Sequence, residues 1–272
     1  MYDIFCAHPR VGGVFESWLF TLDKGLGALF NEVHWPPQNK GLGRVLTRDD
    51  MVEVLRPLAQ SILARGLPPG ADFLVEKSPS HVFTIEVIAE LLPTARFVHV
   101  LRDGRDVAVS VRAAARSWVP AWRSTFGRTI SSSARTWRHT VQLARAAGNQ
   151  LGDRFLEIRF EDIKRQPLAS YARLFSFAGI PHDSTVLDNV YQATDFDMNY
   201  KPRQAGFRRK GIVGDWLTEL GLLDRILFHR SAYDMLRQTG YELSPSWILR
   251  RKPPGEGHEA AATNSERTTF PL

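Results

Sequence analysis

Hydrophobic positions along the chain fall into two patterns, short continuous runs and stripes at helical spacing. The short runs predict strands at residues 4–7, 73–76, 97–101 and 155–160. The stripes, in which apolar residues recur three or four positions apart, predict helices over residues 15–20, 51–62, 82–92, 105–116, 134–144 and 168–178. Because residues 73–116 read strand, helix, strand, helix, we expect a right-handed parallel crossover and hence an α/β fold.

Residues typical of helix ends indicate where several of these helices begin or stop. Thr47-Arg48-Asp49-Asp50 is similar to a capping box and predicts a helix start. Pro57 is expected to kink that helix or to mark its boundary. Ser78 and Pro79 favour a second helix start, as N-cap and first helical residue, and Pro93 ends that helix.

A change in composition near residue 250 indicates the domain organisation. From Arg250 onwards Pro, Gly, Glu, Ala and Thr dominate, and few residues are apolar. Such a segment has too little apolar surface to pack. We therefore expect one domain over residues 1–249 and a disordered tail over residues 250–272.

Composition narrows the functional classes. The chain has 272 residues, of which 43% are hydrophobic and 24% charged, as in ordinary globular proteins. Cys6 is the only cysteine, which excludes an internal disulfide and a Cys-based zinc site. No apolar run of about 18 residues and no signal-peptide pattern occurs, so we expect a cytoplasmic protein without a membrane span. The net charge of +6 favours an anionic partner: a nucleic acid, a polyanionic sugar, an acidic lipid or a nucleotide.

Three of the predicted strands lead to a basic residue, namely Arg10, Lys77 and Arg102. Ligands of open parallel sheets bind at the carboxyl ends of the strands, where helix N-termini add backbone N–H donors. We therefore expect the three cations to converge on one anion site. The phosphate loop of nucleoside triphosphatases, G-x-x-x-x-G-K-[ST], does not occur, so a nucleoside triphosphate is not favoured.

Residues 101–110 read L-R-D-G-R-D-V-A-V-S, with an Arg and a Ser eight positions apart. This segment resembles the 3′-phosphate motif of sulfotransferases that use 3′-phosphoadenosine 5′-phosphosulfate, in which the Arg and the Ser bind the phosphate. These two residues are Arg102 and Ser110. Residues 207–216, F-R-R-K-G-I-V-G-D-W, resemble the F-x-R-K-G-x-x-G-D-W signature of the cytosolic enzymes. The resemblance implies that this segment closes over the same phosphate through Arg208, Arg209, Lys210 and Gly211.

Two further segments extend the resemblance to the 5′ end of the donor. Residues 8–13, H-P-R-V-G-G, are similar to the phosphosulfate loop, often P-R-S-G-T-T, so the implied loop residues are Arg10, Val11, Gly12, Gly13 and Val14. Where relatives have hydroxyl residues, this loop has Val and Gly, which leaves Arg10 and backbone N–H groups to hold the phosphate. Residues 75–79, V-E-K-S-P, resemble the V-E-K-[ST]-P segment of the heparan-sulfate glucosaminyl sulfotransferases. The implied role of Lys77 is to assist Arg10 at the leaving phosphate.

The resemblance covers residues from about 4 to 245 and implies the P-loop-like sulfotransferase fold. This is a single three-layer α/β domain with a central, mostly parallel sheet flanked by helices. Thr194 and Phe196 match a T-x-F segment that contacts adenine, and Phe15 stands where the cytosolic enzymes have a Trp that stacks on the base. The implied co-substrate is 3′-phosphoadenosine 5′-phosphosulfate, with adenosine 3′,5′-bisphosphate as product, and the chemistry needs no metal.

A candidate catalytic base lies in residues 31–35, N-E-V-H-W, which resemble the E-V-H-F segment of the glucosaminyl 3-O-sulfotransferases. Their proposed base is the Glu, which corresponds to Glu32. His34 is the alternative, because the cytosolic enzymes use a His. The expected reaction is in-line sulfuryl transfer to a hydroxyl or amine, with a base for the proton and cations for the leaving phosphate.

The acceptor remains open between a carbohydrate and a small molecule, and no nucleic-acid partner is expected. Because the phosphosulfate loop departs from the family pattern, two other hypotheses stay open. One is a catalytically inactive homologue that binds the nucleotide as a sensor or scaffold. The other is a basic polyanion-binding protein without a nucleotide site. The oligomeric state is not predicted.

Overall fold

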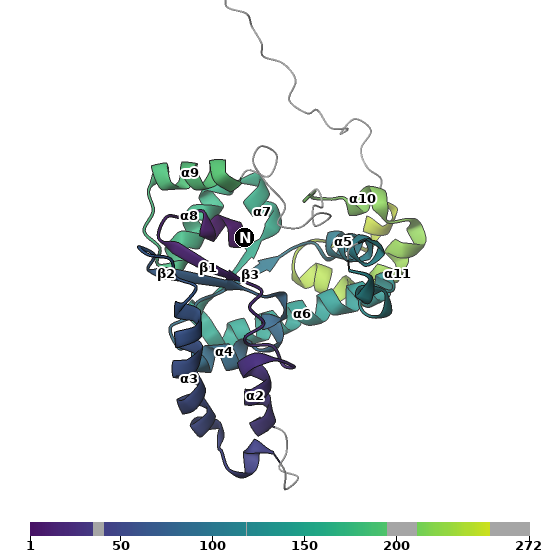
Figure 1. Cartoon of the computed structure of the whole chain (residues 1–272). Helices are drawn as coiled ribbons and strands as arrows, with labels where there is room; N and C mark the ends of the chain where they lie inside the picture. Colours follow the sequence, from purple (N-terminus) through teal and green to yellow (C-terminus); the bar gives the residue numbers. More distant parts are fainter. Residues whose placement is uncertain (35–40, 118, 195–210, 251–272) are drawn as a thin grey trace, which may run out of the picture.

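The computed structural model describes residues 1–34, 41–117, 119–194 and 211–250 (Figure 1). Its strands are β1 (Val11–Phe15), β2 (Phe73–Lys77), β3 (Phe97–Leu101) and β4 (Phe155–Arg159). Its α-helices are α1 (Tyr2–Cys6), α2 (Gly25–His34), α3 (Arg48–Ala64), α4 (Ile85–Leu91), α5 (Gly104–Arg116), α6 (Ile130–Leu151), α7 (Phe160–Arg165), α8 (Pro167–Ala178), α9 (Ser184–Thr194), α10 (Trp216–Glu219) and α11 (Leu222–Gln238). Short 3₁₀ helices are η1 (Leu42–Arg44), η2 (Pro79–Phe83), η3 (Pro120–Ser124), η4 (Gly152–Arg154) and η5 (Pro245–Leu249).

The strands form two parallel pairs, β1 with β2 and β3 with β4. In the first pair Val11 faces Phe73 and Phe15 faces Lys77, and in the second Leu101 faces Arg159. Side chains from all four strands meet in one apolar core. The expected parallel strands are therefore present, but within the described residues the hydrogen-bonded partner of β2 is β1 rather than β3.

Helices cover the strands on both sides, which confirms the expected α/β fold (Figure 1). On one side α1, α8 and α9 pack on the strands around Phe5, Leu174 and Phe175. On the other side α2, α3 and α4 pack around Phe30 and Leu55. Each layer buries the apolar stripe of its helices against the strands, as an α/β domain requires.

A third apolar core lies beyond the end of β3, between α5, α6 and α11. Leu101 enters it from the strand, and Trp137, Trp216 and Trp247 enter it from α6, α10 and η5. The side chain of Trp247 is completely buried. This core attaches the C-terminal helices to the segment that follows β3 and so determines where Arg102 lies.

The first fifteen residues differ from the sequence-based expectation. Residues 4–7 were expected to form a strand and residues 15–20 a helix, but residues 2–6 form α1 and residues 11–15 form β1. A four-residue apolar run does not distinguish a buried strand from a buried helical turn. Gly12 and Gly13 explain the packing, because a Cβ on Gly13 would overlap Tyr2 and Cys6 of α1. A Cβ on Gly12 would likewise overlap the turn that precedes β2.

Most of the other helix signals are confirmed. Thr47 caps α3 with a complete capping box, in which Asp50 also accepts from the Thr47 backbone N–H. Pro57 lies inside α3 rather than at its boundary. Pro79 begins η2, but the Ser78 hydroxyl donates to Glu76 instead of capping the helix. The expected tail lies outside the described residues except for Arg250, so the domain boundary stays a prediction.

Candidate active site at the strand ends

Arg10 lies at the wrong end of its strand for the role that the sequence suggests. It precedes β1, and its guanidinium Nε donates to Asp72, which precedes β2, at 2.6 Å. Lys77 is the last residue of β2, five positions further along the strand pair than Arg10, so about 16 Å separates the two cations along the strand direction. The expected convergence of Arg10 with Lys77 and Arg102 is therefore wrong.

The expected phosphosulfate loop is wrong for the same reason. Val11, Gly12, Gly13 and Val14 are strand residues paired with β2, and the two glycines serve close packing rather than approach to a phosphate. The turn that follows β1 is formed by residues 16–18. Phe15, at the last position of β1, is 37% exposed and remains at the carboxyl end of the β1–β2 pair.

The turn after β1 has a constrained backbone that the sequence did not indicate. Glu16 and Trp18 both have positive φ, of 50° and 60°. Non-glycine residues rarely adopt this region, and such strain clusters at functional sites. The Glu16 backbone N–H donates to the Lys77 carbonyl at 2.8 Å, which extends the β1–β2 ladder by one step. The sequence marks this turn only by the polar pair Glu16-Ser17, which follows the apolar Val14 and Phe15.

Lys77 lies against this turn. Its Nζ donates to Glu16 Oε1 at 2.6 Å and sits 4.5 Å from the centroid of the Phe15 ring. Both charged side chains are about one-third exposed. Lys77 is therefore at the carboxyl end of its strand, as expected, but its ammonium group is paired with the Glu16 carboxylate.

Glu76 organises the polar groups beside Lys77. It accepts hydrogen bonds from the Ser17 hydroxyl at 2.7 Å and the Ser78 hydroxyl at 2.8 Å, and His81 Nδ1 lies 3.0 Å from its other oxygen. Burial acts to raise the pKa of Glu76, but these hydrogen bonds outweigh it and hold the pKa below the usual value. Glu76 thus ties the turn after β1 to the segment after β2.

Two other histidines near the strands also make hydrogen bonds. The buried His8 pairs through Nε2 with the Pro181 carbonyl at 2.8 Å. His99 Nδ1 lies 3.1 Å from Glu157, which also accepts two hydrogen bonds from Arg145. These residues tie elements together and do not face the strand ends.

Arg102 is the cation at the end of β3, as expected. Its Nη2 donates to the Ile212 carbonyl at 2.9 Å, and its guanidinium carbon lies 4.6 Å from the centroid of the Phe160 ring. The Arg102 Nε is buried and has no hydrogen-bond partner among the described residues. A buried guanidinium N–H without a partner is costly and fits a site for an anionic oxygen, such as the 3′-phosphate.

The two sequence motifs assigned to the 3′-phosphate meet at Arg102. Ile212 belongs to the second motif, residues 207–216, although it lies 110 positions along the chain. Gly211 has a φ of +53° and lies beside Phe160, which also contacts Arg102. Asp106 of the first motif accepts backbone hydrogen bonds from Gly214 and Trp216 of the second, a connection that the sequence analysis did not foresee.

Only some of the remaining expected site residues lie in the part of the chain that the structure describes. Ser110 lies on α5, half-buried, and Thr194 ends α9 with its hydroxyl donating to the Val190 carbonyl. Glu32 is exposed on α2, and His34 is the last residue of that helix. The other expected cofactor residues lie outside the described ones: Phe196, Arg208, Arg209 and Lys210.

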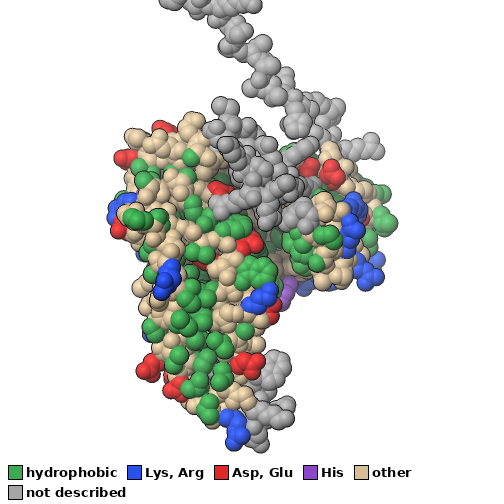
Figure 2. Space-filling model, viewed as in Figure 1, with side chains coloured by type: hydrophobic (Ala, Val, Ile, Leu, Met, Phe, Trp, Pro, Cys, Tyr) green, Lys and Arg blue, Asp and Glu red, His purple; other side chains and the backbone are tan. Residues whose placement is uncertain are grey.

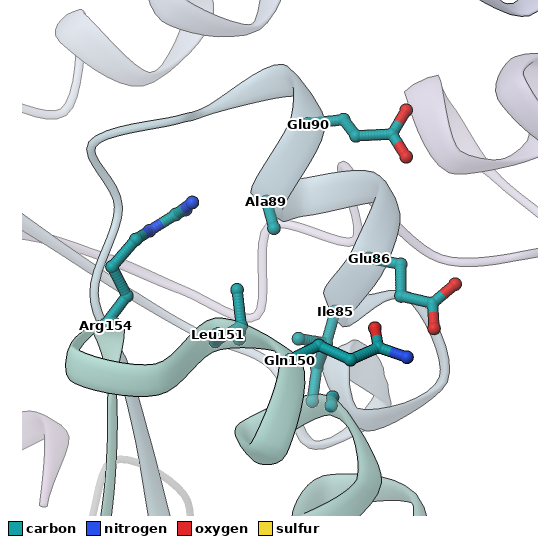
Figure 3. Close-up of a pocket in the computed structure, with 8 residues that line it drawn as sticks. Ile85, Glu86, Ala89, Glu90, Gln150, Leu151 and Arg154 are labelled. Atoms are coloured by element: carbon teal, nitrogen blue, oxygen red, sulfur yellow. The ribbon is translucent and has the colours of Figure 1, made fainter.

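A cavity of about 400 Å³ lies between α4 and the end of α6, lined by Ile85, Glu86, Glu90, Gln150 and Arg154 among others (Figure 3). Arg154 precedes β4, so this cavity lies toward the amino ends of the strands, away from Lys77 and Arg102. On the face shown in Figure 2, described Lys and Arg side chains are dispersed rather than gathered in one patch.

No group of His, Cys, Asp or Glu in the described ranges is arranged to hold a metal ion. None of the described helices combines the length and apolar character that a membrane crossing needs.

Comparison with known proteins identifies the family. The sequence model described as "Sulfotransferase family" matches residues 1–184. An omega-hydroxy-beta-dihydromenaquinone-9 sulfotransferase of Mycobacterium bovis is 25% identical over 168 residues, which cover 58% of this chain but only 42% of that protein. Sulfotransferase 1A1 of Bos taurus is 23% identical over 214 residues, 68% of this chain and 71% of that protein.

The fold is also similar to a solved structure. Mouse sulfotransferase SULT7A1 complexed with PAP superposes with a TM-score of 0.53 at 14% identity, over 91% of this chain and 81% of that one. This likeness concerns the fold, whereas the sequence model spans more than half of the chain. The chain therefore belongs to the sulfotransferase family.

Proposed function

We propose that the protein transfers a sulfuryl group from 3′-phosphoadenosine 5′-phosphosulfate to a hydroxyl or amine of a carbohydrate or small-molecule acceptor. The observation that carries this proposal is the environment of Arg102. Its guanidinium lies at the carboxyl end of β3, is held by Phe160 and Ile212, and keeps a buried Nε without a described partner. Family membership and the named activities of the relatives support the same chemistry.

The nucleotide half of the site is assigned from the two motifs that meet there. In this assignment Arg102 and Ser110 bind the 3′-phosphate, and Arg208, Arg209, Lys210 and Gly211 supply further contacts to it. Charge-assisted hydrogen bonds to a phosphate are about twice as strong as neutral ones, so Arg102 contributes most of the selectivity for this group. Thr194 and Phe196 contact the adenine in this assignment.

The transfer half of the site uses Lys77 in place of Arg10. A bond forms between the acceptor oxygen or nitrogen and sulfur, while the bond from sulfur to the bridging phosphate oxygen breaks. Negative charge develops on the 5′-phosphate, and Lys77 at the end of β2 stabilises it. Glu32 or His34 of α2 takes the acceptor's proton.

A second candidate function is favoured by one observation, the ion pair between Lys77 and Glu16. If Glu16 keeps Lys77 from the leaving phosphate, the protein binds the nucleotide without turning it over and acts as a sensor or scaffold. Nucleotide binding is common to both functions, and turnover separates them.

The test combines binding and turnover. Adenosine 3′,5′-bisphosphate at about 100 times its Kd should raise the free energy of unfolding by about 2.7 kcal/mol. Arg102→Ala should weaken this nucleotide by about 10- to 100-fold, the loss of a charge-assisted contact, and leave adenosine 5′-monophosphate nearly unaffected. Arg112→Ala is the matched control, because it removes one positive charge from α5, where Arg112 pairs with Asp224.

The outcomes distinguish the hypotheses. No stabilisation by saturating adenosine 3′,5′-bisphosphate would exclude both candidate functions. If the nucleotide stabilises the protein but no labelled sulfuryl group is transferred to any acceptor in a panel of carbohydrates, phenols and alkyl alcohols, the inactive homologue is favoured. Equal sensitivity of both nucleotides to Arg102→Ala would show that Arg102 does not read the 3′-phosphate.

A further inference from the structure

Asp106 joins the two segments that are assigned to the 3′-phosphate. Its Oδ2 accepts the Gly214 backbone N–H at 2.8 Å, and its Oδ1 accepts the Trp216 backbone N–H at 2.9 Å. The side chain lies in the first turn of α5, and the residue is only 1% exposed. Because each oxygen serves a different N–H, a carboxylate satisfies both donors at once, and an amide or a hydroxyl cannot.

The same short stretch of chain makes two further contacts with the β3–α5 junction. Arg102 donates to the Ile212 carbonyl, and the guanidinium carbon of Arg105 lies 3.9 Å from the centroid of the Trp216 ring. The segment 212–216 is therefore fastened at three points by Arg102, Arg105 and Asp106. These three residues lie within five positions of the sequence, so a shift of the segment would be transmitted directly to Arg102.

The surroundings of Asp106 disfavour its charged form. Burial raises the pKa of Asp106 to about 6, although the backbone hydrogen bonds from Trp216 and Gly214 act in the opposite direction. The charged groups at the end of β3 that act on it are Asp103, which also raises its pKa, and Arg102, which lowers it. An ionised carboxylate is thus held in a place where ionisation is disfavoured, as is common at functional sites.

We infer that Asp106 is a positioning residue for the 3′-phosphate site. It fixes residues 212–216 against α5, and this keeps the Ile212 carbonyl on one side of the Arg102 guanidinium while Phe160 holds its face. Arg102 is then pre-oriented with its remaining N–H groups available to the nucleotide. The inference rests on the proposed function, because the ligand of Arg102 is the 3′-phosphate.

Selectivity between two nucleotides measures how well Asp106 positions Arg102. It also distinguishes this positioning role from a purely structural role of Asp106. The selectivity is the ratio of the Kd for adenosine 5′-monophosphate to the Kd for adenosine 3′,5′-bisphosphate, both determined by calorimetry. Asp106→Asn keeps the size of the side chain but offers one acceptor instead of two, so the ratio should fall by about tenfold. A general loss of stability would weaken both nucleotides alike and leave the ratio unchanged.

A second variant acts on the same contact without changing Asp106. Gly214 has a φ of +82°, so Gly214→Ala strains the backbone at the hydrogen-bonded residue, while the added Cβ would make only an ordinary contact with Leu217. The ratio should fall here too, by a smaller factor. Glu157→Gln, which breaks an ion pair on β4 with Arg145, is the control for lost stability and should leave the ratio unchanged.

A double-mutant cycle tests the route through Arg102. In an Arg102→Gln background, Asp106→Asn should change the ratio no further, because the group that it positions is gone. Additive effects of the two substitutions would overturn the inference, and so would an unchanged ratio in Gly214→Ala if Asp106→Asn does not fold. Failure of the wild-type protein to prefer the 3′-phosphorylated nucleotide would instead refute the proposed function, and the inference with it.

Discussion

Removing the negative charge of Glu16 should tighten nucleotide binding. Glu16 Oε1 accepts a hydrogen bond from Lys77 Nζ at 2.6 Å, in the place where Lys77 should meet the leaving phosphate. Glu16→Gln keeps the side-chain length and can still accept this hydrogen bond, but it carries no charge. The substitution therefore isolates the repulsion between the Glu16 carboxylate and the bound anion.

The size of the effect follows from the geometry. A phosphate oxygen that accepts a hydrogen bond of about 2.8 Å from the same Nζ lies at most about 5.4 Å from Glu16 Oε1. Because both side chains are about one-third exposed, we take an effective dielectric constant between about 40 and 80. Coulomb's law then gives about 0.8–1.5 kcal/mol, so adenosine 3′,5′-bisphosphate should bind about 4- to 13-fold more tightly.

The assay is calorimetric titration of wild type and Glu16→Gln at two ionic strengths, since added salt should shrink the difference. Asp72→Asn is the matched control. It removes a carboxylate from the exposed ion pair with Arg10 at the opposite end of the same two strands. The affinity of Asp72→Asn should equal that of wild type.

The result that would refute this reasoning is weaker or unchanged binding by Glu16→Gln in low salt. Weaker binding would mean that Glu16 orients Lys77 for the nucleotide rather than competing with it. A gain of affinity in Asp72→Asn similar to that in Glu16→Gln would mean that only the net charge of the protein matters. In that case Arg10 would have to be reconsidered as a nucleotide contact.

Three further predictions concern the base, the pH dependence of stability and the packing of β1. If Glu32 is the base, Glu32→Gln should lower turnover by about 10²- to 10⁴-fold with little change in nucleotide affinity; loss of turnover in His34→Gln alone would move the role to His34. Burial acts to raise the pKa of Glu157, yet its His and Arg partners hold it at about 2, well below its usual value. The stability that Glu157 contributes should thus be complete above about pH 5 and vanish toward pH 2. In urea titrations the free energy of unfolding of Glu157→Gln should be about 1–3 kcal/mol lower than that of wild type at pH 7, and the two values should converge in acid. Gly13→Ala should lower the free energy of unfolding by about 1–3 kcal/mol because its Cβ overlaps Cys6, and an unchanged melting curve would contradict the assigned packing of α1.

The elements that were predicted correctly are those with long or well-bounded patterns. The stripe of α6, with Ala134, Trp137, Val141 and Ala144 all buried, extends over many turns and has one interpretation. The run at residues 4–7 is too short to distinguish a strand from a helix. Its conformation depends on a tertiary contact, the packing of α1 against Gly13. Such a contact leaves no local signal in the pattern of hydrophobic residues.

The site shows the same division. The position of Arg102 at the end of β3 was predicted correctly because its strand, its turn and its helix are contiguous in sequence, while its role at the 3′-phosphate stays a proposal. Arg10 was misplaced because its role depended on where β1 begins, and a shift of a few residues moved it to the other end of the strand. The contacts from Asp106 to Gly214 and Trp216 span more than one hundred positions, and a pattern within each motif could not pair them.

The third apolar core has a consequence for how the protein is made. Trp216 and Trp247 lie over the buried guanidinium of Arg105, beside the strand end that holds Arg102. Chains emerge from the ribosome with the N-terminus first, and domains begin to fold as they emerge. The Arg105 guanidinium, beside the end of β3, therefore stays without its aromatic cover until the segment carrying Trp247 has been translated. A ribosome that stalls before this point would hold a chain whose third apolar core is still incomplete.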